Sequence, residues 1–190
     1  MEKINIGFAL TGSFCTFKKA INTMRGLKEA GHNIFPIMSY NAYSTDTRFG
    51  KAYEFRDSIE AICERHIISS IAEAEPIGPK KLLDILIIEP CTGNTLAKLA
   101  NSIADTPVTL AAKSHLRNGR PVLIAISTND ALAGASKNIG ALLNYKNVYF
   151  IPYNQDDAEN KPTSIVADFT LTEKAMLSAL NGKQLQPLII

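Results

Sequence analysis

Short apolar runs alternate with longer amphipathic stretches along most of this chain. The apolar runs have the length and composition of buried strands and cover residues 4–10, 32–38, 82–88, 121–126 and 147–151. The amphipathic stretches predict helices over residues 16–30, 51–66, 95–104, 107–117, 130–144 and about 171–180. Strands that alternate with helices are typical of an α/β protein with a parallel sheet between layers of helices. The segments 39–50 and 67–81 are expected to be loops.

Length and composition predict one domain spanning residues 1–190, because a chain of this size can bury one sizeable core. The content of 46% hydrophobic and 20% charged residues is ordinary for a soluble globular protein. The net charge is only +2, and the densest basic group, within residues 18–28, has the spacing of one solvated helix face. Binding to nucleic acid is therefore disfavoured.

The chain shows no feature that predicts a membrane or extracellular location. No apolar run approaches the ~20 residues that a membrane span needs, and the N-terminus lacks a charged-then-apolar signal segment. Cys15, Cys63 and Cys91 are far apart and odd in number, which indicates neither a disulfide framework nor a metal site. A reducing cytoplasm fits best.

One polar loop carries the strongest functional signal. The strand predicted at 82–88 leads into Pro90-Cys91-Thr92-Gly93-Asn94-Thr95, and a helix follows at once. Open α/β sheets bind ligands at the carboxyl ends of their strands. The loop supplies hydroxyl and amide groups, and the new helix offers N–H donors, but no strong acid, base or metal ligand is present. These groups predict a site that binds a polar, flat or anionic molecule. The loop residues by themselves are not expected to catalyse bond cleavage.

A second loop, Thr11-Gly12-Ser13-Phe14, lies between the first strand and its helix. Such a turn points N–H groups and the positive end of the helix outward, which suits a phosphate. The spacing from Gly7 to Gly12 imitates a Walker A loop, but Lys and Ser/Thr are missing at Ser13 and Phe14, and no G-x-G-x-x-G occurs. Nucleotide hydrolysis and ordinary dinucleotide binding are therefore disfavoured. A plain capped strand-to-helix turn remains the alternative.

Two further loops follow the second and fourth strands. The first begins at Ser39 and brings hydroxyls, amides and two tyrosines that could contact a ring system. The second contains Ser127, Asn129 and Asp130. Taken alone, the first is at least equally consistent with a surface loop, and a helix N-cap is the preferred interpretation for either Asn129 or Asp130. Because four polar loops fall on one edge of the predicted sheet, together they favour a shared ligand.

These loops resemble those of the flavoprotein family of homo-oligomeric FMN-containing cysteine decarboxylases. The strand followed by Thr11-Gly12-Ser13 is similar to the family's N-terminal glycine loop. The run 90–95 with Leu96-Ala97-Lys98-Leu99-Ala100-Asn101 is similar to its Pro-Ala-Ser-Ala-Asn-Thr motif. The resemblance implies a doubly wound, Rossmann-like three-layer α/β fold, a parallel sheet flanked by helices. It also implies FMN bound near a subunit interface, in trimers or multiples of trimers.

The resemblance also implies cofactor-binding residues. In relatives the glycine loop holds the flavin phosphate, and the Asn-Thr motif touches the flavin or the substrate beside it. By position, two serines complete the pocket. The implied cofactor-binding set is Thr11, Gly12, Ser13, Phe14, Ser39, Pro90, Cys91, Thr92, Asn94, Thr95 and Ser127.

Departures from the family pattern disfavour cysteine decarboxylation. The family's catalytic histidine is replaced by Pro76, and its Pro-x-Met-Asn substrate clamp has no counterpart in Ile126-Ser127-Thr128-Asn129. An acid/base imidazole is therefore missing. We expect His32, His66 and His115 to be surface or capping residues, so the catalytic residues stay unassigned. Cys91 is expected to be a small buried side chain, with a thiolate activated by the helix N-terminus as the alternative.

Residues 106–113, 161–168 and 182–187 are similar to one group within the family. That likeness implies an oxidoreductase subunit that needs a partner subunit, with a nicotinamide cofactor, NAD(P), on the partner. The implied reaction dehydrogenates a small dihydropyridine dicarboxylate to an aromatic ring. Two alternatives remain open: a non-catalytic FMN-binding or regulatory subunit, and an FMN-dependent decarboxylase-type relative.

Overall fold

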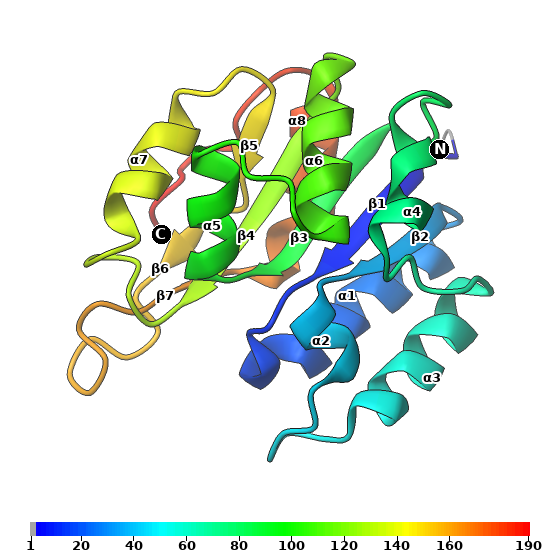
Figure 1. Ribbon diagram of the computed structural model, residues 1–190. Helices are drawn as coiled ribbons and strands as arrows, with labels where there is room; N and C mark the ends of the chain where they lie inside the picture. The colour runs from blue at the N-terminus through cyan, green and yellow to red at the C-terminus, as the bar shows by residue number, and fades with distance from the viewer. Residues whose placement is uncertain (1–2) are drawn as a thin grey trace.

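A seven-stranded sheet lies at the centre of the computed structural model, which describes residues 3–190 (Figure 1). Its parallel part runs in the order β2-β1-β3-β4-β5. This order is that of flavodoxin-like doubly wound sheets, and it confirms the predicted fold class. The parallel strands are β1 (Asn5–Leu10), β2 (Asn33–Met38), β3 (Ile85–Cys91), β4 (Val122–Thr128) and β5 (Val148–Phe150).

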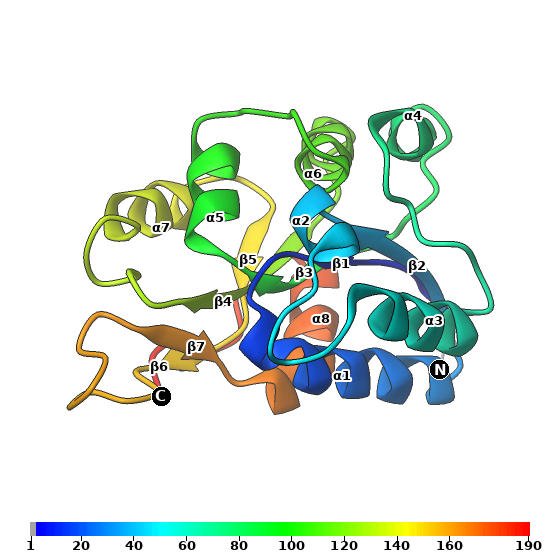
Figure 2. The same ribbon diagram turned by 60° about the horizontal axis from the view of Figure 1, so that its bottom comes forward.

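Helices cover both faces of the sheet (Figure 2). One face carries α1 (Phe17–Glu29), α3 (Ala52–Cys63) and α8 (Thr172–Leu180). The other carries α4 (Ile71–Ala74), α5 (Gly93–Ala100), α6 (Pro107–Arg117) and α7 (Ser136–Leu143). Because helices lie on both sides, β3 is buried at every position, which explains its nearly continuous apolar sequence. No helix among residues 3–190 is long and apolar enough to span a membrane.

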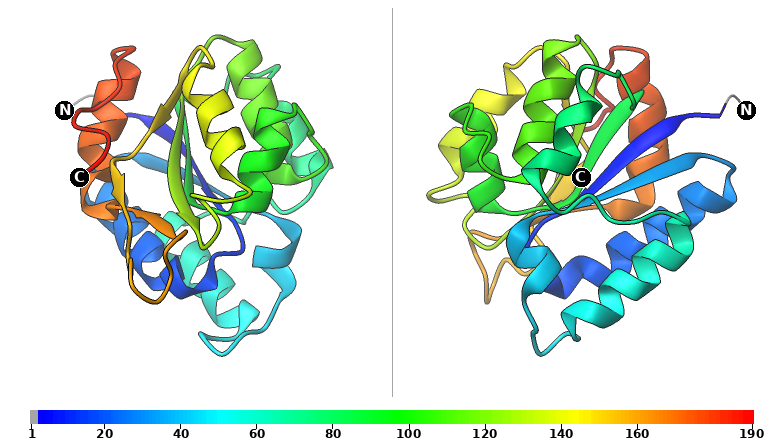
Figure 3. Two further views of the ribbon diagram at one scale, coloured as in Figure 1. Left: turned by 90° about the vertical axis from the view of Figure 1, so that its left-hand side faces the viewer. Right: turned by 45° about the vertical axis from the view of Figure 1, so that its right-hand side comes forward.

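A short antiparallel arm extends the sheet beyond β4. It consists of β6 (Tyr153–Asn154) and β7 (Ile165–Ala167), and β7 pairs with the end of β4. The arm lies beside the start of α1 (Figure 3). The C-terminal tail runs along the far side of β6, where Tyr153 exchanges backbone hydrogen bonds of 3.0 and 3.2 Å with Leu188 and Ile190. Sequence analysis missed both strands because two or three residues show no periodicity.

The strand predicted at 82–88 lies further along the chain, because β3 runs from Ile85 through Pro90 to Cys91. Pro90 has no N–H to donate, and the pairing with β4 shifts register between Ile88 and Cys91. The polar loop is therefore shorter than expected. It begins at Thr92, directly at the edge of the sheet.

Three other predictions were partly wrong. The helix predicted over 130–144 begins only at Ser136, because residues 130–135 form turns in which the Asp130 carbonyl accepts the N–H groups of Ala133 and Ala135. The predicted loop 39–50 contains the one-turn helix α2 (Tyr40–Ser44). The predicted loop 67–81 contains α4 and the 3₁₀ turn η2 (Glu75–Ile77). Short helices of this length lack the repeating pattern that sequence analysis needs.

Candidate functional site

Thr11 joins the carboxyl ends of β1 and β3. Its Oγ1 donates a hydrogen bond to the Pro90 carbonyl at 2.8 Å and accepts one from the Thr92 N–H at 3.0 Å. Its own N–H also donates to the Pro90 carbonyl, at 3.2 Å, and its side chain is buried. This junction is the point at which the strand order reverses, where doubly wound sheets bind their ligands.

The loop after β3 is shaped by the start of α5. Thr92 caps the helix, since its Oγ1 accepts the Thr95 N–H at 3.3 Å and lies 3.1 Å from the Thr95 hydroxyl. Between these two buried or half-buried threonines, the Asn94 side chain is exposed. Ser39 caps α2 in the same way, accepting the Ala42 N–H at 3.4 Å. The loop therefore uses its threonines to fix the backbone and leaves the asparagine amide available.

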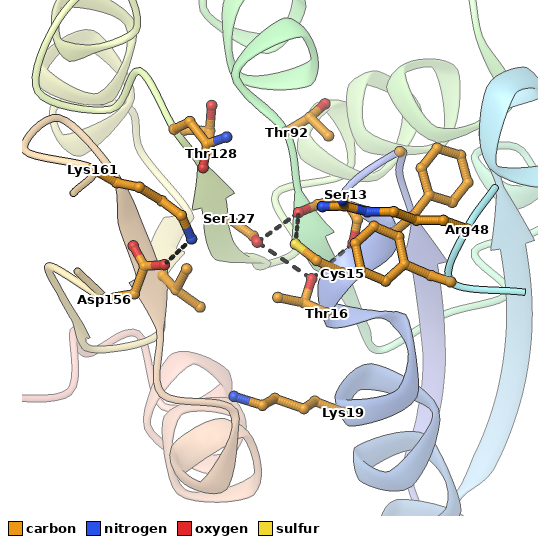
Figure 4. A pocket seen from close by; sticks show the side chains of 15 residues that line it. Ser13, Cys15, Thr16, Lys19, Arg48, Thr92, Ser127, Thr128, Asp156 and Lys161 are labelled. Carbon is orange, nitrogen blue, oxygen red and sulfur yellow. Dashed lines mark hydrogen bonds and ion pairs between the residues drawn. The ribbon is translucent and has the colours of Figure 1, made fainter.

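The glycine loop contacts the end of β4 through hydroxyl groups (Figure 4). Ser13 Oγ lies 2.7 Å from Ser127 Oγ, and Thr16 Oγ1 lies 3.3 Å from the same atom. Thr16 also donates to the Ser13 carbonyl at 2.9 Å. The loop then enters the 3₁₀ turn η1 (Phe14–Thr16) and α1, where the first N–H groups have no partner within the helix. Hydroxyl and N–H donors gathered in this way form a cradle for an anion.

Two hollows flank the Thr11–Thr92 junction and share Gly12 and Thr92. The serine hollow, of about 580 Å³, lies between the glycine loop and the β6–β7 arm. The threonine hollow, of about 330 Å³, lies between α2 and α5. The serine hollow is lined mainly by residues 12–16, Lys19, Arg48, residues 127–129, Asp156 and Lys161. The threonine hollow is lined by Thr11, Gly12, residues 39–41, Thr92, Asn94, Thr95, Lys98 and Thr106.

Cations predominate around the serine hollow. Lys19, Arg48 and Lys161 come from α1, the α2–α3 loop and the arm, and Asp156 is the one carboxylate among the lining residues described. Figure 4 shows Lys161 and Asp156 facing the serine pair from the opposite wall, and their charged atoms are 3.4 Å apart. The excess of positive charge favours an anionic ligand.

Among the described residues that line the threonine hollow, Lys98 alone carries an ammonium group. Both carboxylate oxygens of Asp105 lie 2.8 Å from its Nζ. The hydrogen bond from Lys98 holds the pKa of Asp105 below its usual range, so the pair is ionised at neutral pH. Asp105 thus fixes the position of the Lys98 head group at the edge of the hollow.

Sequence analysis missed the charged residues of the site. It assigned Lys19 to a solvated helix face; the residue is exposed but lines the serine hollow. Arg48, Asp156 and Lys161 lie in segments without periodicity. Their position depends on the β6–β7 arm and on the path of the α2–α3 loop, and no local motif signals either feature. Lys98 lies in the run 96–101 that follows the polar loop, but sequence analysis did not assign it to the site.

The structure brings most of the expected site residues to the two hollows. Pro90 and Cys91 are the exceptions, because both lie within β3 and line neither hollow. Pro90 contributes only its carbonyl, to Thr11. Cys91 is buried, and burial raises the pKa of its thiol far above the ordinary value. The alternative of an activated thiolate is therefore wrong.

No histidine among residues 3–190 lines either hollow. His66 is exposed as expected, but the expectation of surface or capping positions was wrong for His32 and His115, which are 3% and 1% exposed. His32 lies in the turn before β2 and His115 in the last turn of α6, so that no regular apolar pattern marked their burial in the sequence. Pro76 lies in η2, against α6, and lines neither hollow. The described site therefore contains no imidazole acid or base.

A side chain at Gly93, the first residue of α5, would have to displace two side chains of the loop after β4. A Cβ there would lie 2.7 Å from Asp130 Oδ1 and 2.9 Å from Thr128 Oγ1, atoms joined by a 2.6 Å hydrogen bond. We expect Gly93→Ala to displace the loop after β4 and lower the free energy of unfolding by about 1–3 kcal/mol, measured in urea. Gly140→Ala is the control, because it lies inside α7 with nothing within 4 Å, and should stabilise by about 0.4–1 kcal/mol. Equal stability of the two variants would contradict the clash.

Comparisons with known proteins agree with this architecture. Residues 1–171 match the family model described as Flavoprotein. The chain is 44% identical over 185 residues to the B subunit of dipicolinate synthase from Bacillus subtilis (strain 168), covering 97% of this chain and 92% of that protein. It is 43% identical to the B subunit of dipicolinate synthase from Bacillus halodurans C, whose crystal structure superimposes with a TM-score of 0.90 and coverage of 98% and 96%.

A more distant structure shares the fold. The FMN-dependent cysteine decarboxylase SpaF superimposes with a TM-score of 0.64 at 21% identity, over 93% of this chain and 97% of that one. The family model covers most of the chain, and the first relative matches nearly all of it. The resemblance stated from the loop motifs is thereby confirmed, and the chain belongs to the flavoprotein family.

Proposed function

We propose that the protein is the B subunit of a dipicolinate synthase. Together with the A subunit of that enzyme it would dehydrogenate a dihydrodipicolinate-type precursor to dipicolinate (pyridine-2,6-dicarboxylate), in the cytoplasm of the bacterial mother cell during sporulation. The observation that carries this proposal is the 44% identity, over 97% of the chain, to a protein of that name. The family relation supports a homo-oligomer built from trimers, with the nicotinamide cofactor, NAD(P), on the partner.

The serine hollow has the groups that a flavin phosphate requires. The hydroxyls of Ser13 and Thr16 both lie within 3.3 Å of the Ser127 hydroxyl at the start of a helix, and three cationic side chains line the same hollow. We infer that Gly12, Ser13, Phe14 and Ser127 would hold the phosphate of FMN, and that Thr11 would fix this loop through its hydrogen bonds to Pro90 and Thr92. A bound flavin supplies a hydride acceptor, which amino-acid side chains lack.

The threonine hollow offers donors suited to the substrate. Loss of one hydride and one proton converts a dihydropyridine ring into an aromatic pyridine, and the two carboxylates must be held while this happens. Lys98 supplies an ammonium group, Asn94 an amide and Ser39 a hydroxyl. In this proposal these residues bind and orient the dicarboxylate beside the flavin, and Thr92, which lines both hollows, lies between the two ligands.

Decarboxylation is the weaker alternative, because neither hollow has a histidine among its described lining residues.

A regulatory, non-catalytic role can be distinguished from the proposed catalytic one by measuring dipicolinate formation. With the purified partner, NAD(P)⁺ and precursor, addition of this chain should raise dipicolinate formation at least about tenfold, equivalent to about 1.4 kcal/mol of barrier. Asn94→Ala should lose most of that increase, whereas Asn181→Ala, at the exposed end of α8, should keep it. If the partner works at full rate on its own and this chain adds nothing, the proposal fails.

A further inference from the structure

A further hollow lies among the ends of the three helices α5, α6 and α7, which cover the same face of the sheet (Figure 1). Its volume is about 610 Å³. One side of α6 lines it, together with Leu99, Ser102 and Ile103 at and after the end of α5 and residues 144–146 after α7. It shares no lining residue with the serine or the threonine hollow. We call it the α6 groove.

The α6 groove exposes apolar side chains. Ile103 is 47% exposed and Tyr145 is 39% exposed, and Leu99 and Leu116 beside them are only partly buried against the core. The Tyr145 hydroxyl donates a hydrogen bond to the Ala100 carbonyl at 2.6 Å, which holds the aromatic ring between the ends of α5 and α7. Exposed apolar side chains around a fixed tyrosine are typical of a protein–protein contact.

The charged side chains of the α6 groove are all cations. Lys113, Arg117 and Lys146 line it, and no carboxylate stands among the lining residues described. Within residues 3–190 none of the three makes an ion pair or a side-chain hydrogen bond. Four other lysines of the chain do have a carboxylate partner: Lys28, Lys51, Lys98 and Lys161. The uncompensated positive charge favours an acidic partner.

A second copy of this chain offers no acidic surface to match the groove. Most carboxylates among residues 3–190 already have a hydrogen-bond or ion-pair partner. Those without one each lie on a different element, namely Glu29 in α1, Asp57 in α3, Glu75 in η2, Glu159 between β6 and β7, and Glu173 in α8. Three neighbouring cations around an apolar surface are therefore better matched by a different protein.

We propose that the α6 groove docks the A subunit through an acidic segment that also carries apolar side chains. The inference rests on the proposed function, which requires such a partner. Carboxylates of the segment pair with Lys113, Arg117 and Lys146, and its apolar side chains cover Ile103 and Tyr145.

The side of α6 that lines the groove has a length suited to a short segment. Thr109, Lys113, Leu116 and Arg117 follow the spacing i, i+4, i+7, i+8, which places them along one face of the helix. From the first to the last of them α6 rises about 12 Å, at 1.5 Å per residue. That length equals about two turns of a docked helix.

The α6 groove also adjoins the proposed substrate site. Ser102 and Ile103 line the groove, whereas Lys98 and Thr106, on either side of them in the chain, line the threonine hollow. Asp105, in the same connection, holds the Lys98 ammonium group at 2.8 Å. A partner seated in the groove therefore contacts the segment that positions Lys98, close to the place where the substrate would bind.

Binding of the purified A subunit to the full-length chain tests the inference by calorimetric titration. We expect Lys113→Glu and Ile103→Asp each to weaken the affinity by at least about tenfold. Lys137→Glu and Leu132→Asp are the matched controls, because both residues are exposed and line neither the groove nor the two hollows. Added salt should weaken binding of the wild type more than binding of Lys113→Glu. In the dipicolinate assay the two groove variants should need about tenfold more chain for half of the maximal rate but reach the same maximum.

The outcomes separate this inference from the function on which it rests. If both groove variants bind the A subunit as tightly as the wild type, the docking site is refuted while the proposed function stands. If sedimentation of the chain alone shows that Ile103→Asp breaks a homo-oligomer into smaller species, the groove belongs to contacts between copies and the inference is overturned. If the A subunit neither binds the wild-type chain nor gains activity from it, both proposals fail.

Discussion

The Glu89→Gln variant should lose less stability than the wild-type protein as the pH rises from 6.5 to 8. Glu89 lies in β3 and is 0% exposed. Its Oε2 is 2.7 Å from Thr172 Oγ1, and its Oε1 has no partner in the described structure. Burial raises the pKa of this carboxyl to about 8, against which the hydrogen bond from Thr172 acts in the opposite direction.

The surroundings of Thr172 also favour the protonated acid. Its Oγ1 lies 2.7 Å from Glu89 Oε2 and 2.8 Å from the Phe169 carbonyl oxygen, but a hydroxyl group has one hydrogen to donate. Both contacts are hydrogen bonds at once only when Glu89 carries a proton and donates it to Thr172. Ionisation would leave a charge in the buried interior with only the hydroxyls of Thr172 and Thr23 to offset its desolvation.

The sign of the effect follows from the direction of the shift. Because the pKa of Glu89 is higher in the folded chain (about 8) than its ordinary value of 4.5, the folded state holds the proton more tightly. The contribution to stability is complete below pH 4.5 and is lost as the pH rises through about 8. The slope is about 1.4 kcal/mol per pH unit, so the loss between pH 6.5 and 8 is about 2 kcal/mol.

A second buried group, His115, sets the lowest pH at which the effect of Glu89 on stability can be measured alone. Burial lowers the pKa of His115 to about 4 from its ordinary value of 6.5, so its contribution is present above pH 6.5 and is lost as the pH falls through 4. Between pH 4.5 and 6.5 the two groups oppose each other. Above pH 6.5 the effect of Glu89 is the larger one.

Urea unfolding of the wild type and the variant at pH 6.5, 7.25 and 8 measures the difference in slope. Glu159→Gln, a replacement in the exposed part of the arm, should follow the wild type. Parallel curves for wild type and Glu89→Gln would show that the carboxyl is not held neutral.

The Ser13→Asp variant should lose FMN binding by more than about 100-fold, or about 2.7 kcal/mol. Ser13 Oγ is 2.7 Å from Ser127 Oγ, so a carboxylate at this position faces the proposed phosphate at short range, and like charges repel by several kcal/mol in such a site. Ser13→Ala removes only one neutral donor, and we expect a loss of about tenfold. Ser136→Asp, on the exposed first turn of α7, is the charge-matched control and should bind normally.

A cysteine beside the cradle provides an independent measurement. Cys15 is exposed, with its Sγ 3.8 Å from Ser13 Oγ, whereas Cys63 and Cys91 are buried. A thiol reagent should therefore modify one cysteine per folded chain, and FMN should slow that reaction in the wild type but not in Ser13→Asp. If FMN protects Cys15 equally in both proteins, the phosphate does not occupy this cradle.

Sequence analysis placed the site residues at the ends of strands but did not predict the contacts between them. Ser13 and Ser127 are 114 residues apart, and each could be placed at a strand end from local patterns. Their 2.7 Å contact depends on the order of the strands and on the exact end of β4, which local patterns do not contain. The bounds predicted for β3 were wrong for a related reason. A proline normally ends a strand, but the pairing of Cys91 with β4 continues β3 past Pro90.

The charged residues that line the serine hollow could not be predicted from the sequence. Lys161 reaches the serine hollow because β7 pairs antiparallel with β4 and brings the arm over the edge of the sheet. That pairing involves only two residues of β4, so no periodic pattern marks it. Arg48 similarly depends on a loop held by Asp46, whose Oδ1 accepts the Ala52 N–H at 2.9 Å. Long-range pairing, rather than local propensity, sets the charge of this site.

The tail that runs along β6 also covers an edge with which another chain could otherwise pair. An edge strand with free N–H and C=O groups is a template on which another chain can add a strand, and this is a common route to aggregation. On β6 the backbone of Tyr153 is already paired with Leu188 and Ile190, so the strand-like tail occupies the position an intruding chain would take. Residues 188–190 thus block intermolecular β-pairing at this edge of the arm.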